Sequence, residues 1–231
     1  MTSRTEELAE RLRVVRARID AACARAGRSA DEVTLVVVTK AFPASDVRLL
    51  ASLGVRDVGE NRDQEASRKV RQCADVDVVW HFVGQLQSNK ARSVARYADV
   101  VHSVDRVRLA DALSRAATSA GRSVTALVQV SLDDGPGRGG ARPDDVAAVA
   151  DRVASAPGLV LGGVMAVAPL GADPRPAFAR LARVSDALRT THPDATWVSA
   201  GMSADLEAAL EHGATHVRVG SAILGERPPD G

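Results

Sequence analysis

Residues 34–39 read TLVVVT, and Lys40 follows directly. A run of this kind, apolar and rich in β-branched residues, predicts a strand that is buried on both faces of a parallel sheet. Seven similar runs follow along the chain, at residues 55–59, 76–83, 98–104, 124–130, 159–167, 196–199 and 215–219. The stretches between them are helix-like and begin with residues that favour a helix start, such as Ser, Asp and Pro. The chain therefore alternates strands with helices.

This alternation predicts parallel strands joined by right-handed crossovers. Eight such units in about 200 residues fit an α/β fold of the (β/α)8 type, the TIM barrel. A doubly wound open sheet is the alternative, but it has five or six strands, so two of the runs would have to be something else. Residues 3–26 predict an additional amphipathic helix that ends at Gly27. We expect one domain over residues 1–231, with an N-terminal helix in 1–27 and the barrel in 34–227.

The composition excludes several classes of function. The 30 Lys and Arg residues nearly balance the 29 Asp and Glu residues, and only 3% of residues are aromatic. A nucleic-acid binder usually needs a basic surface or stacking aromatic side chains, so this class is disfavoured. No apolar run approaches the length of about 18 residues that predicts a membrane span, and the charged start is unlike a signal peptide. Cys23 and Cys73 lack metal-ligand spacing, which favours a reducing, cytoplasmic location.

Only three of the 30 basic residues are lysines, namely Lys40, Lys69 and Lys90. Since this chain uses Arg wherever a positive charge suffices, a remaining Lys suggests chemistry that Arg cannot perform. Lys can lose its proton and act as a nucleophilic amine or form an imine. Lys40 stands at the rim of a buried strand, where partial desolvation lowers an amine's pKa. The alternative for Lys40 is a side chain that merely extends into solvent. For Lys69 and Lys90 we expect solvated helix faces.

Small and polar residues gather at the ends of the predicted strands, where a barrel has its active site. These are Glu60, Asn61, His81, Gln85, Ser103, Ser131, Met165, Ser199, Gly201, Ser203, Arg218, Gly220 and Ser221. Strand ends also become polar simply because they reach solvent. The last two units, at residues 197–227, resemble an anion cradle, because Gly and Ser permit close backbone approach and a helix start favours phosphate. Turn formation alone is the competing explanation. Arg218 lies inside a strand run, so we expect it to point into the barrel mouth or to pair within it.

Two other patterns are weak. The segment GPGRGG at residues 135–140 matches a dinucleotide-binding glycine pattern, but no acidic residue follows at the required distance, so we expect a flexible loop. His212 and His216 are four residues apart, but Gly213 interrupts the helix between them. Without a third ligand at suitable spacing, we expect no metal site.

Several motifs in order resemble the pyridoxal phosphate homeostasis protein family (YggS/PROSC type), a single-domain relative of the alanine racemase N-terminal barrel. They are VVVTKAFP at 36–43, GENRDQE at 59–65, WHFVGQLQSNK at 80–90, VHSVD at 101–105, LVQVS at 127–131, LGGVMAVAP at 161–169 and SAGMSADLEAALEHGATHVRVGSAILGER at 199–227. The resemblance covers nearly the whole chain. It implies a fold-type III barrel that binds pyridoxal 5′-phosphate (PLP).

The resemblance also implies roles for particular residues. Lys40 would form a Schiff base with the cofactor, and Arg218 would face the pyridine nitrogen. Ser203, Gly220 and Ser221 would hold the phosphate, while Asn61 and His81 would line the ring. The chain departs from the family at Ser131, where Asn is usual, at Ala200, where Met is usual, and in the Gly-rich segment 135–140. These departures concern the contacts of that segment rather than the cofactor site.

The resemblance implies a cytoplasmic protein of vitamin B6 homeostasis, without established catalytic turnover, that buffers or delivers PLP. Its partners would be PLP and, transiently, apo forms of PLP-dependent enzymes, and the protein would be a monomer. One alternative is a PLP-dependent amino-acid racemase, which needs a second acid or base opposite the lysine. Tyr97, the one tyrosine, lies in a helix-like segment, and we expect no second domain to supply another. A cofactor-free Schiff-base aldolase is the second alternative.

Overall fold

A closed barrel of parallel strands forms the centre of the protein in the computed structural model, which describes residues 3–132 and 139–226. Eight strands follow one another around the barrel in chain order. They are β1 (Thr34–Val38), β2 (Asp57–Glu60), β3 (Val79–Phe82), β4 (Val100–Val104), β5 (Val124–Gln129), β6 (Leu159–Met165), β7 (Trp197–Ser199) and β8 (His216–Val219). Each lies within one of the runs predicted from the sequence, apart from Glu60 at the end of β2. The prediction of a (β/α)8 barrel is confirmed, and the open-sheet alternative is wrong.

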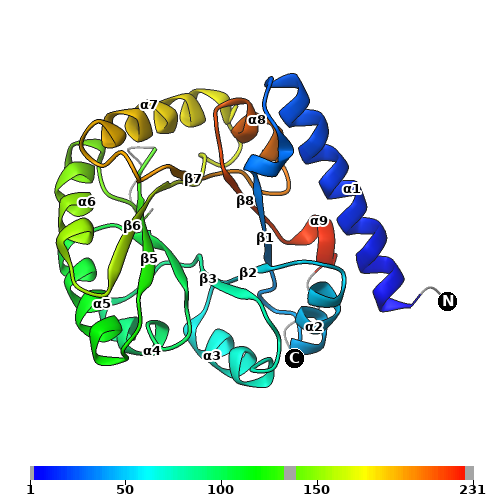
Figure 1. Ribbon diagram of the computed structural model, residues 1–231. Coiled ribbons are helices and arrows are strands. Elements are labelled where there is room, and N and C mark those ends of the chain that lie inside the picture. The colour runs from blue at the N-terminus through cyan, green and yellow to red at the C-terminus, as the bar shows by residue number, and fades with distance from the viewer. Residues whose placement is uncertain (1–2, 133–138, 227–231) are drawn as a thin grey trace.

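Helices surround the strands, as Figure 1 shows. They are α1 (Arg4–Arg25), α2 (Ala44–Ser52), α3 (Asp63–Gln72), α4 (Ala91–Val94), α5 (Val107–Ser119), α6 (Val146–Ser155), α7 (Arg175–Thr191), α8 (Leu206–Glu211) and α9 (Ser221–Leu224). Short 3-10 turns occur at Ala30–Glu32, Ser88–Lys90 and Pro143–Asp145. Among the residues described, no helix combines the length and the apolar character that a membrane span requires.

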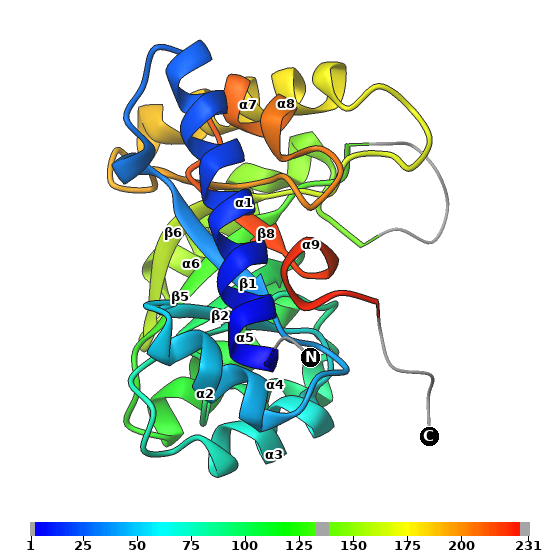
Figure 2. The same ribbon diagram turned by 90° about the vertical axis from the view of Figure 1, so that its right-hand side faces the viewer.

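The predicted N-terminal helix is present as α1. A capping box at its start joins the Ser3 side chain to the Glu6 amide, while the Glu6 carboxylate accepts from the Ser3 amide. One face of the helix is buried, through residues spaced three or four apart: Leu8, Leu12, Val15, Ile19, Ala22 and Cys23. This face packs on α8 and α9, so α1 lies along the side of the barrel where the chain closes on itself (Figure 2).

The barrel closes through the pairing of β1 with β8. Val36 lies opposite Arg218, and Val37 lies opposite Val219. Both strands run in the same direction, so their carboxyl ends meet at one rim of the barrel. The residues that follow β1 and those that follow β8 are therefore neighbours, although they are far apart in the sequence.

Strand β6 contains an irregularity at its two glycines. In the pairing with β5, Ala126 lies opposite Leu161 but Leu127 lies opposite Gly163, so Gly162 is an extra residue. Gly163 has a φ of +146°, and a Cβ atom added there would lie 2.0 Å from the carbonyl oxygen of Trp197. Only glycine allows β7 to approach β6 this closely.

Other expectations from the sequence stay open. The predicted flexible loop at residues 135–140 falls mostly outside the described residues, which resume at Gly139. The assignment of residues 1–231 to one domain, with the barrel ending at 227, stays a prediction.

We expect Gly163→Ala to lower the free energy of unfolding by more than about 3 kcal/mol, because the added carbon collides with the Trp197 backbone. The control is Gly171→Ala, where φ is +77° but no atom lies within 4 Å of the added carbon. Gly171→Ala should lower the free energy of unfolding by only about 1–2 kcal/mol, because it places a side chain on a left-handed backbone without a steric collision. Chemical denaturation measures both variants, and equal losses would contradict the steric explanation.

Candidate functional site

Lys40 lies just beyond the carboxyl end of β1, where its side chain is half-buried. The residue after it, Ala41, has a φ of +65° and is the only non-glycine residue with positive φ in the part of the chain that is described. This conformation costs a residue with a Cβ atom about 1–2 kcal/mol. Lys40 thus lies at the rim of the barrel, next to a strained backbone turn. Strained residues of this kind are common at functional sites.

The carboxyl end of β8 lies beside this turn. A Cβ atom on Gly220 would lie 3.2 Å from the carbonyl oxygen of Val38, so the two strand ends are in close contact. Ser221 begins α9, and its hydroxyl lies 3.4 Å from that of Ser203, which also lies 3.4 Å from the amide nitrogen of Ala222. The structure therefore brings together Ser203, Gly220 and Ser221, which the sequence predicted as a group. Two hydroxyls and an amide converge there, and such donors suit an anion.

Helix α1 holds this group from outside. Arg18 donates to both carboxylate oxygens of Glu207, at 2.7 and 2.9 Å, and to the carbonyl oxygen of Ser203 at 3.0 Å. Arg4 donates to the carbonyl oxygen of Leu224, at the end of α9, and forms an ion pair with Asp46 in α2 at 2.6 Å. The additional helix thus anchors the two segments that carry Ser203 and Ser221.

Arg218 is buried inside the barrel. It donates one hydrogen bond to the Ser199 hydroxyl and a second, at 2.9 Å, to the carbonyl oxygen of Ala166. Burial lowers the pKa of Arg218 to about 10, and the charge of Asp205 opposes this shift. The guanidinium therefore keeps its proton at neutral pH while its partners in these two bonds are neutral. Its inward orientation matches the expectation from the sequence.

A chain of hydrogen bonds leads from Arg218 across the barrel interior. His102 Nδ1 lies 2.9 Å from the Ser199 hydroxyl, and His102 Nε2 lies 2.8 Å from His81 Nδ1. His81 Nε2 lies 2.9 Å from the carboxylate of Asp57, the first residue of β2. These distances allow each group to donate to the next one along the chain, from the Arg218 guanidinium, which only donates, to the carboxylate of Asp57.

Two buried histidines are held in their neutral form. Burial, followed by the charge of His81, lowers the pKa of His102 well below its ordinary value. Burial also lowers the pKa of His216 to about 4, with His81 and Arg218 adding to the shift and Asp57 opposing it. The His216 ring packs on Trp197 with 4.3 Å between the ring centres, and its Nδ1 lies 2.8 Å from the Thr215 hydroxyl.

Asn61 and His81 lie at different depths. Asn61 directly follows β2 and is half-buried, and a Cβ atom on Gly84 would lie 2.1 Å from its carbonyl oxygen. The loops after β2 and β3 therefore touch at this glycine, which sets the position of Asn61. His81 is fully enclosed and is bonded to Asp57 and His102. A contact of either residue with a cofactor ring stays a prediction.

The expectation that Lys69 lies on a solvated helix face is wrong. Its side chain is only 4% exposed, and its ammonium lies 2.5 Å from Glu60 Oε1, 3.2 Å from Glu65 Oε1 and 2.7 Å from the Thr39 carbonyl oxygen. The sequence contained a signal for this burial, because Ala66, Val70 and Cys73 mark one face of the helix and Lys69 lies on it. Lys90 is half-buried at the start of α4.

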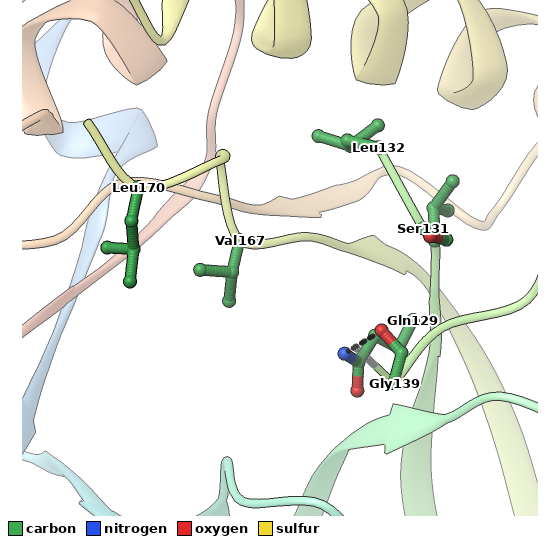
Figure 3. Close-up of a pocket in the computed structure, with 7 residues that line it drawn as sticks. Gln129, Ser131, Leu132, Gly139, Val167 and Leu170 are labelled. Carbon is green, nitrogen blue, oxygen red and sulfur yellow. Dashed lines mark hydrogen bonds between the residues drawn. The ribbon is translucent and has the colours of Figure 1, made fainter. Parts of the chain in front are cut away.

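A pocket of about 280 Å³ opens at the carboxyl ends of β5 and β6 (Figure 3). The Gln129 side chain donates to the carbonyl oxygen of Gly139 at 2.8 Å on one side of the pocket, and Val167 and Leu170 project from the other. Ser131 also lines it. The pocket lies on the same rim as Lys40, since all the strands of the barrel are parallel.

Neither His212 nor His216 belongs to a group of three or more potential metal ligands within residues 3–132 and 139–226. The sequence reasoning missed two interior features: the cluster of Lys69 with Glu60 and Glu65, and the roles of Asp57 and His102 in the hydrogen-bond chain. Asp57 and His102 lie within or beside predicted strands, but no linear pattern indicates that their side chains meet.

Comparisons with known proteins agree with this geometry. The family model described as alanine racemase, N-terminal domain, matches residues 11–228. A pyridoxal phosphate homeostasis protein of Mycobacterium bovis is 44% identical over 243 residues, covering 97% of this chain and 94% of its own. The protein of the same name from Escherichia coli is 38% identical over 227 residues, covering 96% of this chain and 97% of its own. The structure of PipY from Synechococcus elongatus, with PLP bound, has a TM-score of 0.84 and 35% identity, covering 94% of this chain and 100% of that chain.

The low pKa of His216 predicts a loss of stability in acid. Unfolded histidine has a pKa of 6.5 and His216 in the folded protein has one of about 4, so the unfolded state binds more protons between these values. The stability from this site is fully present above pH 6.5 and is lost as the pH falls toward 4, by up to about 3 kcal/mol. His216→Gln lacks this dependence. The difference in unfolding free energy between the two proteins should therefore shrink as the pH falls from 6.5 toward 4. A difference that stays constant over this range would contradict the low pKa of His216.

Proposed function

This chain belongs to the pyridoxal phosphate homeostasis protein family, within the alanine racemase N-terminal domain family, and from this membership we propose that it binds PLP and acts in intracellular vitamin B6 homeostasis. We propose that it buffers the cofactor or delivers it. Relatives of that name match almost the full length of the chain, and PipY, a similar structure, holds PLP.

The observation that carries the proposal is the meeting of Lys40 with the carboxyl end of β8. The pairing of β1 with β8 brings an amine, a group of anion-binding donors and a buried arginine to one rim of the barrel. PLP presents an aldehyde, a phosphate and a pyridine ring. Each of these three groups of PLP therefore has a suitable partner among the residues present. Strand ends that are polar only because they reach solvent would not need to match all three.

Each part of the site has a proposed role. The Lys40 amine is the point of covalent attachment, at a half-buried position on the rim of the barrel. Ser203, Ser221 and the backbone at Gly220 bind the phosphate, while α1 keeps these segments in place through Arg18 and Arg4.

Arg218 would face the pyridine nitrogen, and Asn61 and His81 would help to form the ring's surroundings. When bound, PLP supplies an aldehyde and a ring that accepts electrons. Because Arg218 keeps its own proton at neutral pH, it would not protonate the nitrogen, and the ring would be a weak electron acceptor. This arrangement suits holding the cofactor rather than turning over substrates.

A PLP-dependent racemase is the alternative within the same fold. It requires a second acid or base on the face of the ring opposite the lysine. Tyr97 is a poor candidate, because it is buried and its pKa is raised by burial and by the charges of Asp63 and Glu60. Sustained loss of optical purity of an L-amino acid, dependent on Lys40, would favour the racemase. An aldolase without a cofactor would instead cleave its substrate in protein freed of PLP.

We also propose that the protein acts in the cytoplasm as a monomeric single domain, and that apo-enzymes are transient partners. Both thiols, Cys23 and Cys73, are free and buried, which suits a reducing compartment. The transfer of PLP described below tests the apo-enzyme as a partner.

Lys40→Ala should abolish the visible absorption band that the protein gains on addition of PLP, because it removes the amine that attaches the cofactor. Lys90→Ala is the matched control, since it removes another ε-amine and should leave the band unchanged. A titration followed by absorbance, with mass spectrometry of the borohydride-reduced protein, measures both. Labelling at Lys90, or a band that persists without Lys40, would overturn the assignment.

Delivery predicts that PLP reaches an apo-enzyme faster than it is released into solution. We expect the transfer rate to rise with the concentration of apo-enzyme and to exceed the dissociation rate measured with a small-molecule aldehyde trap. Recovered activity of the recipient enzyme reports transfer. A rate equal to dissociation at every concentration would leave buffering as the role and exclude delivery.

A further inference from the structure

The buried lysine Lys69 touches the backbone next to Lys40. Its ammonium has three N–H donors, and three oxygen atoms surround it: the Thr39 carbonyl oxygen, Glu60 Oε1 and Glu65 Oε1, at 2.7, 2.5 and 3.2 Å. We call Lys69, Glu60 and Glu65 the Lys69 cluster. The ammonium and the two carboxylates lie against the strained turn that presents Lys40.

The Lys69 cluster holds this turn from both sides. Before Lys40, the Thr39 carbonyl accepts from Lys69, and the Thr39 hydroxyl donates to Glu60 at 2.5 Å. After Lys40, the amide of Ala41 donates to Glu65 Oε1 at 2.6 Å. Ala41 is the residue with a φ of +65°. A non-glycine residue keeps this conformation only where its surroundings impose it, and the bond to Glu65 is such a restraint.

The residue type at position 69 fits this task. An ammonium is a compact charge with three donors that can point to three acceptors around it, whereas a guanidinium is planar and presents its donors in a fork. The chain has Arg at nearly every basic position, but it has Lys at position 69, where three acceptors surround one nitrogen atom. If Lys69 served only as a solvated surface charge, neither its burial nor its three hydrogen bonds would be needed.

We propose that Lys69 and Glu65, together with Glu60, are positioning residues for Lys40. They fix the turn at Thr39 and Ala41, so that the Lys40 amine meets the cofactor aldehyde with little loss of conformational freedom. The inference rests on the proposed function, since it concerns the same amine. It gives Lys69, Glu65 and Glu60 a part in the capture of the cofactor through the position of Lys40.

The experiment changes the Ala41 side of the turn. Glu65→Ala removes the acceptor of the Ala41 amide, while Glu65→Gln keeps an oxygen there. Glu65 is 31% exposed and lines a surface hollow between α2 and α3, so water can replace the lost carboxylate and the variant should fold. Asp111→Ala is the matched control, because Asp111 is 30% exposed and is also paired, with Arg152, but lies on α5.

Two readouts separate positioning from general stability. Amide exchange followed by NMR should show the Ala41 amide exchanging at least about tenfold faster in Glu65→Ala, and within about threefold of the unchanged protein in Glu65→Gln and Asp111→Ala. Titration with PLP should show at least about tenfold weaker binding in Glu65→Ala and near-normal binding in the other two variants. Rescue by Gln identifies the hydrogen bond, rather than the charge, as the cause.

A second variant tests the other side of the turn. Lys69→Met combined with Glu60→Gln removes both buried charges together, so that neither is left unpaired. Without the donor to the Thr39 carbonyl, we expect PLP binding to weaken at least about tenfold here too.

The outcomes distinguish this inference from the proposed function. If the Ala41 amide exchanges faster but PLP binds as tightly as in Asp111→Ala, or if neither measurement changes, the positioning role is wrong and the proposed function stands. If the unchanged protein binds no PLP, the proposed function fails and the positioning role fails with it.

Discussion

The parallel pairing of β1 with β8 is the contact on which the candidate site depends. It joins the first and last strands of the barrel in one register, with Val36 opposite Arg218. Lys40, Gly220 and Ser221 lie close together only because of this closure. Helix α1 reinforces the same seam from outside, through its packing on α8 and α9 and through Arg4 and Arg18. The site therefore forms only when the ends of the barrel meet.

The barrel interior places charged and polar groups where hydrophobic side chains would usually pack. One continuous series of hydrogen bonds joins Arg218, Ser199, His102, His81 and Asp57, and the Lys69 cluster forms a second polar group under the rim. Buried groups of this kind cost desolvation energy that a hydrophobic core avoids. In return, the hydrogen bonds between these side chains restrict their orientations. The first group orients Arg218 inside the barrel, and the second borders the turn at Lys40.

The sequence predicted the fold well, because the strand runs were long, β-branched and regularly spaced. Lys40, Ser203, Gly220 and Ser221 could be grouped in advance, since parallel strands deliver their carboxyl ends to one rim. Lys69 was misjudged because a charged residue on a helix is normally solvated, although the apolar residues around it mark a buried face. The bond between His81 and His102 depends on the register of β3 and β4 and on side-chain rotamers. Neither is visible in a linear pattern.

The burial of Lys69 also affects how the protein handles a reactive aldehyde. Aldehydes combine reversibly with any accessible ε-amine, so a lysine-rich surface would scatter PLP over many weak attachment points. Here Lys69 is enclosed among three acceptors, and Lys90 is the chain's only lysine besides Lys40 outside that cluster. Arginine provides the positive charge elsewhere and offers an aldehyde no such amine. A chain with so few lysines therefore offers an aldehyde few ε-amines that compete with Lys40.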